Sequence, residues 1–243
     1  MQSTESFDYA YSARPVRNPF RYALAVWRLV RNDPAESTAD AAIVEIGFAR
    51  SRFGRRFARW AETAKVLSED SRTAPALKAR RRFGPIELGG LEALPQGTLG
   101  RVFSDHCRAR DIDPNLIQVP PDDEIGWILN HLYQTHDIWH VVTGWGNDLP
   151  GEVGLGAFYA AQFRSPAFFG YMLALIFLNV ISRRADLDEV FAAFSVGYRA
   201  GRAAQPLFGT AWDELWAQPL EQVRARFQID RSNIVGQGVR EAA

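Results

Sequence analysis

Apolar residues recur at helical spacing along nearly the whole chain, and this periodicity constrains the fold more than any other feature. No stretch alternates apolar and polar residues for long, as a half-buried strand would, and no internal repeat is apparent. An apolar fraction of 47% over 243 residues can fill a substantial core. We therefore predict a single multi-helix, all-α domain.

Composition and charge limit the domain organisation and the classes of partner that we expect. We predict a flexible polar arm over residues 1–18, the all-α domain over 19–230 and a frayed tail over 231–243, because no strong linker separates two cores. A formal net charge of zero favours no nucleic-acid partner. Cys107 is the only cysteine, so we expect it to be buried and in no internal disulfide. The polar N-terminus shows no apolar run typical of a secretory signal.

Capping residues mark several helix ends. Thr98 is the predicted N-cap of a helix that carries Cys107. Asp122 or Asp123 is predicted to cap a helix that runs through His140 and ends at Gly144.

Further helices are expected downstream. The next helix is predicted to open at Glu152, and its small residues at 154–161 would let another helix approach closely. Two more are expected, around Phe191–Ala204 and over Trp212–Phe227, the last bent or divided by Pro219.

Two segments raise the question of membrane contact. The apolar run over 167–182 is too short to span a bilayer, so we interpret it as a buried core helix, with a lipid-contacting interfacial helix as the alternative. Arg52, Arg55, Arg56 and Arg59 share one helical face beside an aromatic face. That pattern is typical of a helix on an anionic membrane, but also of an ordinary amphipathic helix.

Two histidines and two acids form the candidate functional site. His136 and His140 are one helical turn apart, about 40° around the axis, so both imidazoles could reach one cation. Glu152 follows a glycine-containing turn that could fold its carboxylate back towards them. Nitrogen and carboxylate ligands suit zinc or another first-row divalent ion. Asp137 could be a fourth ligand, an acid–base group or a residue that orients an imidazole.

Two histidines four residues apart are weak evidence for a metal site, and the flanking sequence strengthens that evidence. His136-Asp137-x-x-His140-x(11)-Glu152 resembles the HDxxHx(11)E signature of the coenzyme Q biosynthesis protein four family. LPQGTLGR, DDEIGWILNHLYQTHDIWHVVTG, GEVGLGAFYAAQF and YRAGRAAQPLFGTAWDELWAQPLEQVRARFQI resemble further family segments in the same order. The resemblance covers roughly residues 19–230. The other two histidines, His106 and His131, are expected to be capped or half-exposed.

The resemblance implies a fold, a cofactor and an activity. It implies an all-α homodimer, peripheral on a membrane, which for a bacterial homologue means the cytoplasmic, inner face of the cell membrane. It also implies a divalent ion, given as zinc for the family, with manganese, iron or cobalt as alternatives, held by His136, Asp137, His140 and Glu152. The implied reaction is oxidative decarboxylation at C1 of a polyprenylated 4-hydroxybenzoate-derived ubiquinone precursor, with O₂ as candidate oxidant. Asp137 and Glu152 are then the catalytic candidates.

Substrate contacts are expected in two places. The apolar run and the small-residue helix face suggest a groove for the polyprenyl tail or another isoprenoid lipid, with candidates Phe158, Phe168, Phe169 and Met172. Arg199 and Arg202 lie three apart on one helix, and one of them is a candidate partner for the substrate carboxylate.

Two other functions compete with a decarboxylase. One is a non-catalytic, lipid-binding scaffold that organises other ubiquinone-biosynthesis enzymes and holds a structural ion. The other is an HD-type phosphohydrolase, which would need His106 or His131 to converge with Asp186 or Asp188.

Overall fold

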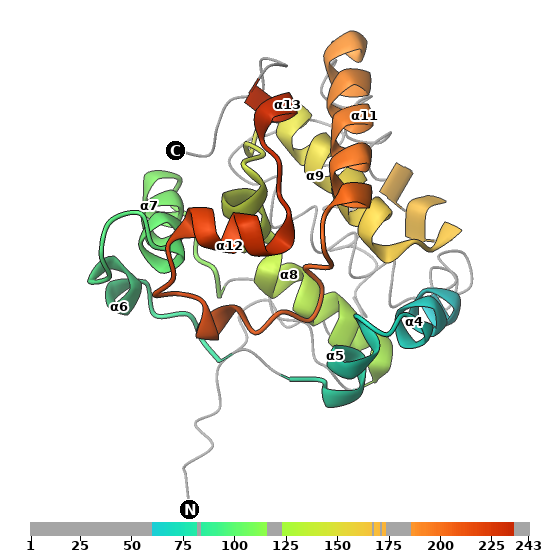
Figure 1. Cartoon of the computed structure of the whole chain (residues 1–243), viewed down its shortest axis with the longest axis horizontal. Helices are drawn as coiled ribbons and strands as arrows, with labels where there is room; N and C mark the ends of the chain where they lie inside the picture. The colour runs from blue at the N-terminus through green and yellow to red at the C-terminus, as the bar shows by residue number, and fades with distance from the viewer. Residues whose placement is uncertain are drawn as a thin grey trace, which may run out of the picture.

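The protein, described here as a computed structural model, is all-α over the described residues, as its periodicity predicts (Figure 1). The structure describes residues 60–81, 84–115, 123–166, 168–170, 172–173 and 186–235. The helices in these ranges are α4 (Trp60–Glu69), α5 (Ala74–Ala79), α6 (Leu88–Glu92), α7 (Leu99–Ala109), α8 (Glu124–Thr143), α9 (Leu149–Phe163), α11 (Leu187–Ala203), the 3₁₀ helix η1 (Trp212–Glu214), α12 (Leu220–Phe227) and α13 (Ser232–Val235). The arginine stripe before Trp60 and most of the apolar run lie outside the described residues.

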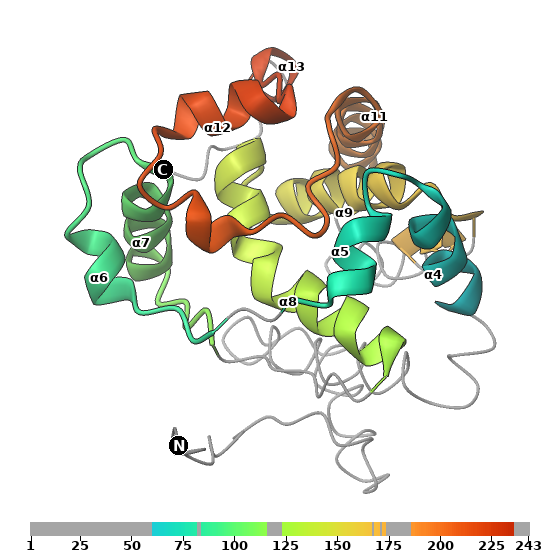
Figure 2. The same cartoon turned by 60° about the horizontal axis from the view of Figure 1, so that its bottom comes forward.

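Helix α8 runs through the middle of the molecule and is contacted by α4, α7, α9 and α12 (Figures 1 and 2). Its start confirms the predicted cap, because the Asp123 carboxylate accepts a hydrogen bond from the Gly126 N–H at 2.7 Å. It ends at Gly144, whose φ of 85° is the left-handed conformation that favours glycine. Ile138 and Trp139 are fully buried. The predicted histidine helix is therefore the centre of the core.

Helices α9 and α11 pack together through glycines. A Cβ added to Gly197 of α11 would lie 2.0 Å from the Gly154 carbonyl oxygen, and one added to Gly201 would lie 2.6 Å from the Phe158 carbonyl oxygen. Since both contacts advance four residues along each helix, the two helices run in the same direction (Figure 1). This confirms the close approach predicted from the small residues. Helix α9 begins at Leu149, three residues before the predicted start at Glu152, because Asp148 is its cap.

The C-terminal segment is divided at Pro219, one of the two outcomes predicted for it. It forms η1 and α12 in place of one continuous helix over 212–227, since Pro219 has extended backbone and is the N-cap of α12. Backbone hydrogen bonds fasten this segment to the start of α7, from the Leu99 N–H to the Gln218 carbonyl oxygen and from the Leu220 N–H to the Gly97 carbonyl oxygen. Thr98 caps α7 as predicted. The tail predicted to be frayed from 231 begins with α13 instead, with Ile234 buried.

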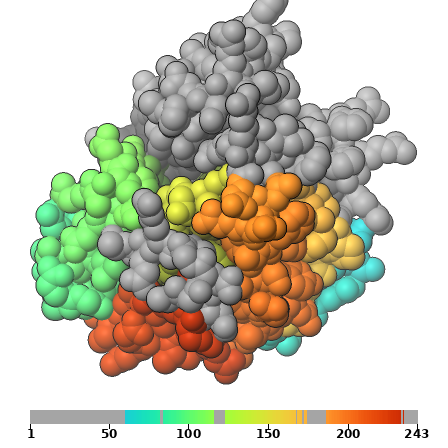
Figure 3. Space-filling view, turned by 90° about the horizontal axis from the view of Figure 1, so that it is seen from above, coloured from blue at the N-terminus to red at the C-terminus, as the bar shows by residue number. Residues whose placement is uncertain are grey.

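Helix α11 also carries an apolar surface, which we call the α11 stripe and define as Leu187, Phe191 and Phe194. Phe191 is 68% exposed and Leu187 55% exposed, and α11 occupies much of the face seen in Figure 3 (orange). In the part of the chain that the structure describes, no helix is both long and apolar enough to cross a bilayer.

Candidate metal centre

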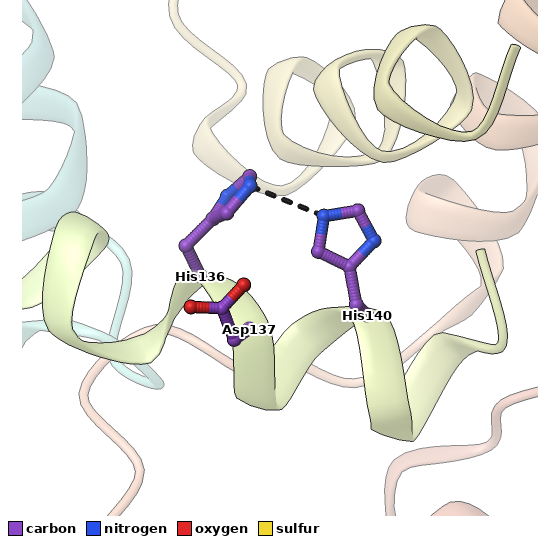
Figure 4. A group of neighbouring side chains, drawn as sticks. All are labelled: His136, Asp137 and His140. Atoms are coloured by element: carbon purple, nitrogen blue, oxygen red, sulfur yellow. Dashed lines mark hydrogen bonds between the residues drawn. The ribbon is translucent and has the colours of Figure 1, made fainter. Parts of the chain in front are cut away.

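His136 and His140 project from successive turns of α8 and bring their ring nitrogens together (Figure 4). Their Nε2 atoms are 3.1 Å apart. One ligand atom of each of His136, Asp137 and His140 lies within 4.8 Å of the others. The three residues predicted from the HDxxH pattern therefore do form a group that could hold a cation.

The turn after α8 folds Glu152 back onto this group. Gly144 reverses the chain with its positive φ, and the Asp148 carboxylate accepts a hydrogen bond from the Gly151 N–H at 3.0 Å to start α9. A Cβ at Gly151 would lie 1.9 Å from the Gly146 carbonyl oxygen, so only glycine allows this tight return. Glu152 consequently occupies the first turn of α9 beside the histidines.

The distances within the cluster match a tetrahedral ion site. Glu152 places Oε2 3.5 Å from His136 Nε2 and Oε1 3.4 Å from His140 Nε2. Ligand atoms about 2.1 Å from a tetrahedral ion are separated by about 3.4 Å, close to these distances and to the 3.1 Å between the two nitrogens. The donor set is two imidazoles and a carboxylate, with a second carboxylate in reach. A zinc-like divalent ion therefore fits the residues present.

A hydrogen bond orients the His140 ring, and the two neighbouring histidines keep Glu152 ionised. His140 Nδ1 lies 2.9 Å from the Trp145 carbonyl oxygen, and since a carbonyl only accepts, Nδ1 carries the proton and the Nε2 lone pair faces the cluster. Burial works to raise the pKa of Glu152, but His140 and His136 outweigh it and hold that pKa below its usual range. Glu152 is therefore a carboxylate at neutral pH. The side chains of His136 and Glu152 stay 37% and 38% exposed, whereas His140 is buried.

Arg224 of α12 supports the end of α8, a role that the sequence did not indicate. The guanidinium is buried and donates from Nε to the Val142 carbonyl oxygen at 2.9 Å and from Nη2 to the Val141 carbonyl oxygen at 2.8 Å. These are carbonyls of the last turn, which lack partners within the helix. Arg224 thus anchors the turn that follows His140.

The prediction of half-exposed His106 and His131 is wrong, because packing against α8 and the C-terminal segment buries both rings. His131 accepts a hydrogen bond from the Gly209 N–H at 2.9 Å, and burial lowers its pKa to about 4. His106 stacks on His140, with ring centroids 6.3 Å apart. Cys107 is buried as predicted, and burial, more than the nearby Asp137, raises its pKa to about 12.

The aromatic substrate candidates separate into two groups. Phe158 is a core residue against Trp139, and Phe168 is a core residue against Trp60 and Phe163. In contrast, Phe169 is half-buried against Phe194 and Tyr198, and Met172 is partly buried on the core. Phe169 is thus beside the α11 stripe.

The basic and acidic candidates on α11 lie at the surface. Arg199 and Arg202 are exposed, on faces other than the glycine face that packs on α9. Asp186 caps the N-terminus of α11, accepting hydrogen bonds from the Asp188 and Glu189 N–H groups. Asp186 is thus engaged as a helix cap and His131 is bound to Gly209, so this pair of phosphohydrolase candidates has other structural roles.

Comparison with known proteins confirms the family resemblance. The model of the family described as "Coenzyme Q (ubiquinone) biosynthesis protein Coq4" matches residues 61–233. The chain is 25% identical over 169 residues to the mitochondrial ubiquinone biosynthesis protein COQ4 homolog of Rattus norvegicus, covering 67% of this chain and 63% of that protein. It is 28% identical over 148 residues to the corresponding protein of Eremothecium gossypii, covering 59% and 45%. The chain thus spans less than two thirds of the length of these relatives.

A solved structure has the same fold. A crystal structure of a protein from Nostoc punctiforme, described as a ubiquinone biosynthesis protein, superposes with a TM-score of 0.68 at 25% sequence identity. The match covers 88% of this chain and 99% of that one.

Proposed function

Because the chain belongs to the coenzyme Q (ubiquinone) biosynthesis protein Coq4 family, we propose that it is a metal-dependent oxidative decarboxylase. Its substrate in this proposal is a polyprenylated, 4-hydroxybenzoate-derived precursor of ubiquinone. The C1 carboxylate leaves as CO₂ and a hydroxyl takes its place. One observation supports metal chemistry above all others, namely that His136, His140 and Glu152 hold their ligand atoms 3.1–3.5 Å apart.

The overall change is a two-electron oxidation. One aromatic acid, one water and one O₂ give one phenol, one CO₂ and one H₂O₂: water supplies the oxygen of the new hydroxyl, and O₂, the oxidant that we assign, accepts two electrons and two protons. A divalent ion in the cluster would act as a Lewis acid on the substrate oxygens, and iron, manganese or cobalt would add a route for electrons that zinc lacks.

The chain's own residues have separate roles in this proposal. The Nε2 atoms of His136 and His140 would be the nitrogen ligands, with the His140 ring oriented by the Trp145 carbonyl. Glu152 contributes the negative charge that favours a cation, and its partial exposure leaves the cluster open on one side. We assign Asp137, within 4.8 Å of the histidine nitrogens, to hold the proton exchanged with the substrate.

The lipid part of the substrate requires an apolar surface. We assign the polyprenyl tail and a peripheral contact with the inner face of the bacterial membrane to the region of Phe169, Met172 and the α11 stripe. This region combines exposed Leu187 and Phe191 with half-buried aromatic rings. Basic Arg199 and Arg202 on the same helix suit an anionic head group or lipid. A homodimer and contact with other ubiquinone-biosynthesis enzymes belong to the same proposal.

The alternative function is a scaffold that binds lipid and carries the ion only for structure. The exposed α11 stripe is the observation that favours it, since an apolar patch of this kind marks an interaction surface. A structural ion site, however, has a closed shell, whereas His136 and Glu152 are more than one third exposed. The open side favours chemistry.

A turnover assay separates the two functions. The purified protein is analysed for metal, loaded in parallel with zinc, iron, manganese or cobalt, and incubated under air with 3-geranyl-4-hydroxybenzoate labelled at the carboxyl carbon. Labelled CO₂ and the hydroxylated product are expected with at least one metal, and Glu152→Gln should lose both while remaining folded. No CO₂ with any of the four metals would refute the decarboxylase and leave the scaffold.

A further inference from the structure

Of the buried polar groups that lack a hydrogen-bond partner among the described residues, two are carried by rings that stack on the histidine pair. They are the hydroxyl of Tyr159, whose side chain is 5% exposed, and both ring nitrogens of His106, which is fully buried. Buried polar groups in native proteins are nearly always paired, so an unpaired one points to a missing water, ion or ligand. These two groups are therefore candidates to bind a ligand at the cluster.

Their placement brackets the candidate metal centre. Tyr159 lies on α9 two turns after Glu152, and its ring is parallel to that of His136, with centroids 6.1 Å apart and an 8° angle between planes. His106 comes from α7 and stacks on His140. His136 thus stacks on the ring of Tyr159 and His140 on the ring of His106, and each of these two rings carries an unpaired polar group.

The Tyr159 ring is held in place independently of its hydroxyl. It stacks on Trp139 with centroids 4.1 Å apart and a 12° angle between planes, and Trp139 is fully buried in α8. A phenol hydroxyl carries a proton that it can donate.

We propose that Tyr159 is a substrate-binding residue whose hydroxyl donates a hydrogen bond to the carboxylate of the aromatic acid at the metal centre. The assignment rests on the proposed function, which supplies an aromatic acid as the ligand. A carboxylate only accepts hydrogen bonds, so it suits a fixed phenol donor that has no partner of its own. A water molecule would satisfy the same hydroxyl only until the acid displaces it.

The experiment compares Tyr159→Phe with wild type, each loaded with Co²⁺, whose visible absorption reports on metal binding and on ligands next to the metal. Ser68→Ala is the control, because it deletes an exposed hydroxyl on α4, which carries none of the residues assigned to the site. The probes are 3-geranyl-4-hydroxybenzoate and 2-geranylphenol, which lacks the carboxylate. Apo-protein melting temperature is measured as well.

Tyr159→Phe is expected to weaken binding of the acid by about 10-fold or more, equivalent to about 1.4 kcal/mol. It should bind the phenol and Co²⁺ as wild type does, and its apo form should melt at the same or a higher temperature, because an unpaired hydroxyl has been removed. Ser68→Ala should match wild type in every measurement.

Three results would overturn the assignment. Equal affinity of Tyr159→Phe and wild type for the acid would refute the role of Tyr159 and leave the proposed function intact. Equal weakening for acid and phenol, together with a lower apo melting temperature, would identify a structural role instead. Wild-type Co²⁺ protein that binds neither probe would refute the proposed function and this assignment with it.

Discussion

The contact between α9 and α11 offers a direct test of how the helix packing supports the metal centre. Gly197→Ala would place a methyl group 2.0 Å from the Gly154 carbonyl oxygen and 2.7 Å from its carbonyl carbon. Normal van der Waals contact needs about 3.5 Å, so the two helices must separate by about 1 Å or more. The obstacle is backbone, which cannot rotate away as a side chain can.

The effect of Gly197→Ala on the free energy of unfolding is the balance of two opposing effects. Overpacking typically destabilises by about 1–3 kcal/mol, and a clash with backbone belongs at the upper end. Alanine is favoured over glycine inside a helix by about 1 kcal/mol, which offsets part of this. We expect Gly197→Ala to lower the free energy of unfolding by about 2 kcal/mol, or the melting temperature by about 4–8 °C for a domain of this size. Because Gly154 is half a turn from Glu152, we also expect the Zn²⁺ affinity to fall by about 10-fold.

Urea denaturation and competition with a chromophoric chelator measure the two effects. Gly90→Ala is the matched control, since Gly90 lies inside α6 with nothing within 4 Å of an added Cβ. That variant should be slightly more stable than wild type and bind Zn²⁺ equally. If Gly197→Ala behaved as Gly90→Ala does, α9 and α11 would not be in backbone contact, and the reasoning that places Glu152 through this packing would fail.

Three further predictions concern the site and its supports. Glu152→Gln should lower Zn²⁺ affinity by at least about 100-fold, because a ligand charge is lost at unchanged shape; a chelator competition giving less than 10-fold would exclude Glu152 as a ligand. Arg224→Met should lower the free energy of unfolding by about 3–5 kcal/mol, since it removes the buried donors to the last turn of α8; a loss below 1 kcal/mol in urea would contradict that anchor. His131 has a pKa of about 4 in the folded protein. As the pH falls from about 6.5 to about 4, the His131 imidazole is therefore protonated only in the unfolded chain. This group alone then lowers the free energy of unfolding of the wild type by about 1.4 kcal/mol per pH unit. The stability difference between wild type and His131→Gln should therefore shift in favour of the variant by about 3 kcal/mol between pH 7 and pH 4, and a difference independent of pH would show that His131 is not buried in its neutral form.

Local signals predicted the helices that position the site. Asp123, Gly144 and Thr98 act where the sequence indicates, because caps and left-handed glycines depend only on the residues next to them. The start of α9 was placed three residues late, since Asp148, Leu149 and Pro150 form a capped first turn that was interpreted as part of the loop. Pro219 was recognised as a break, but η1 before it depends on tertiary hydrogen bonds to α7.

The roles of Arg224, His106 and His131 could not be predicted in this way. Each is set by a neighbour far away in the chain, respectively the end of α8, His140 and Gly209. A lone histidine on a helix is compatible with a surface position or with burial, and composition does not choose between them. An arginine near the C-terminus has the same ambiguity, because only the packed structure shows which carbonyls it reaches.

The site has two functions, binding a cation and recognising an organic acid, and only the residues for the first could be predicted from the sequence. The candidate ion ligands lie within seventeen residues, on one helix and the first turn of the next, so a short turn and two glycines are enough to bring them together. A cation needs only charge and lone pairs at the right separation, and one turn can provide these. Recognition of an organic acid instead needs a donor at a fixed distance from the ion, and Tyr159 acquires that position by stacking on Trp139 and His136 across the α8–α9 interface. Substitutions that loosen this interface should therefore impair acid binding more than metal binding, because three of the four candidate ligands share α8, whereas the donor depends entirely on helix packing.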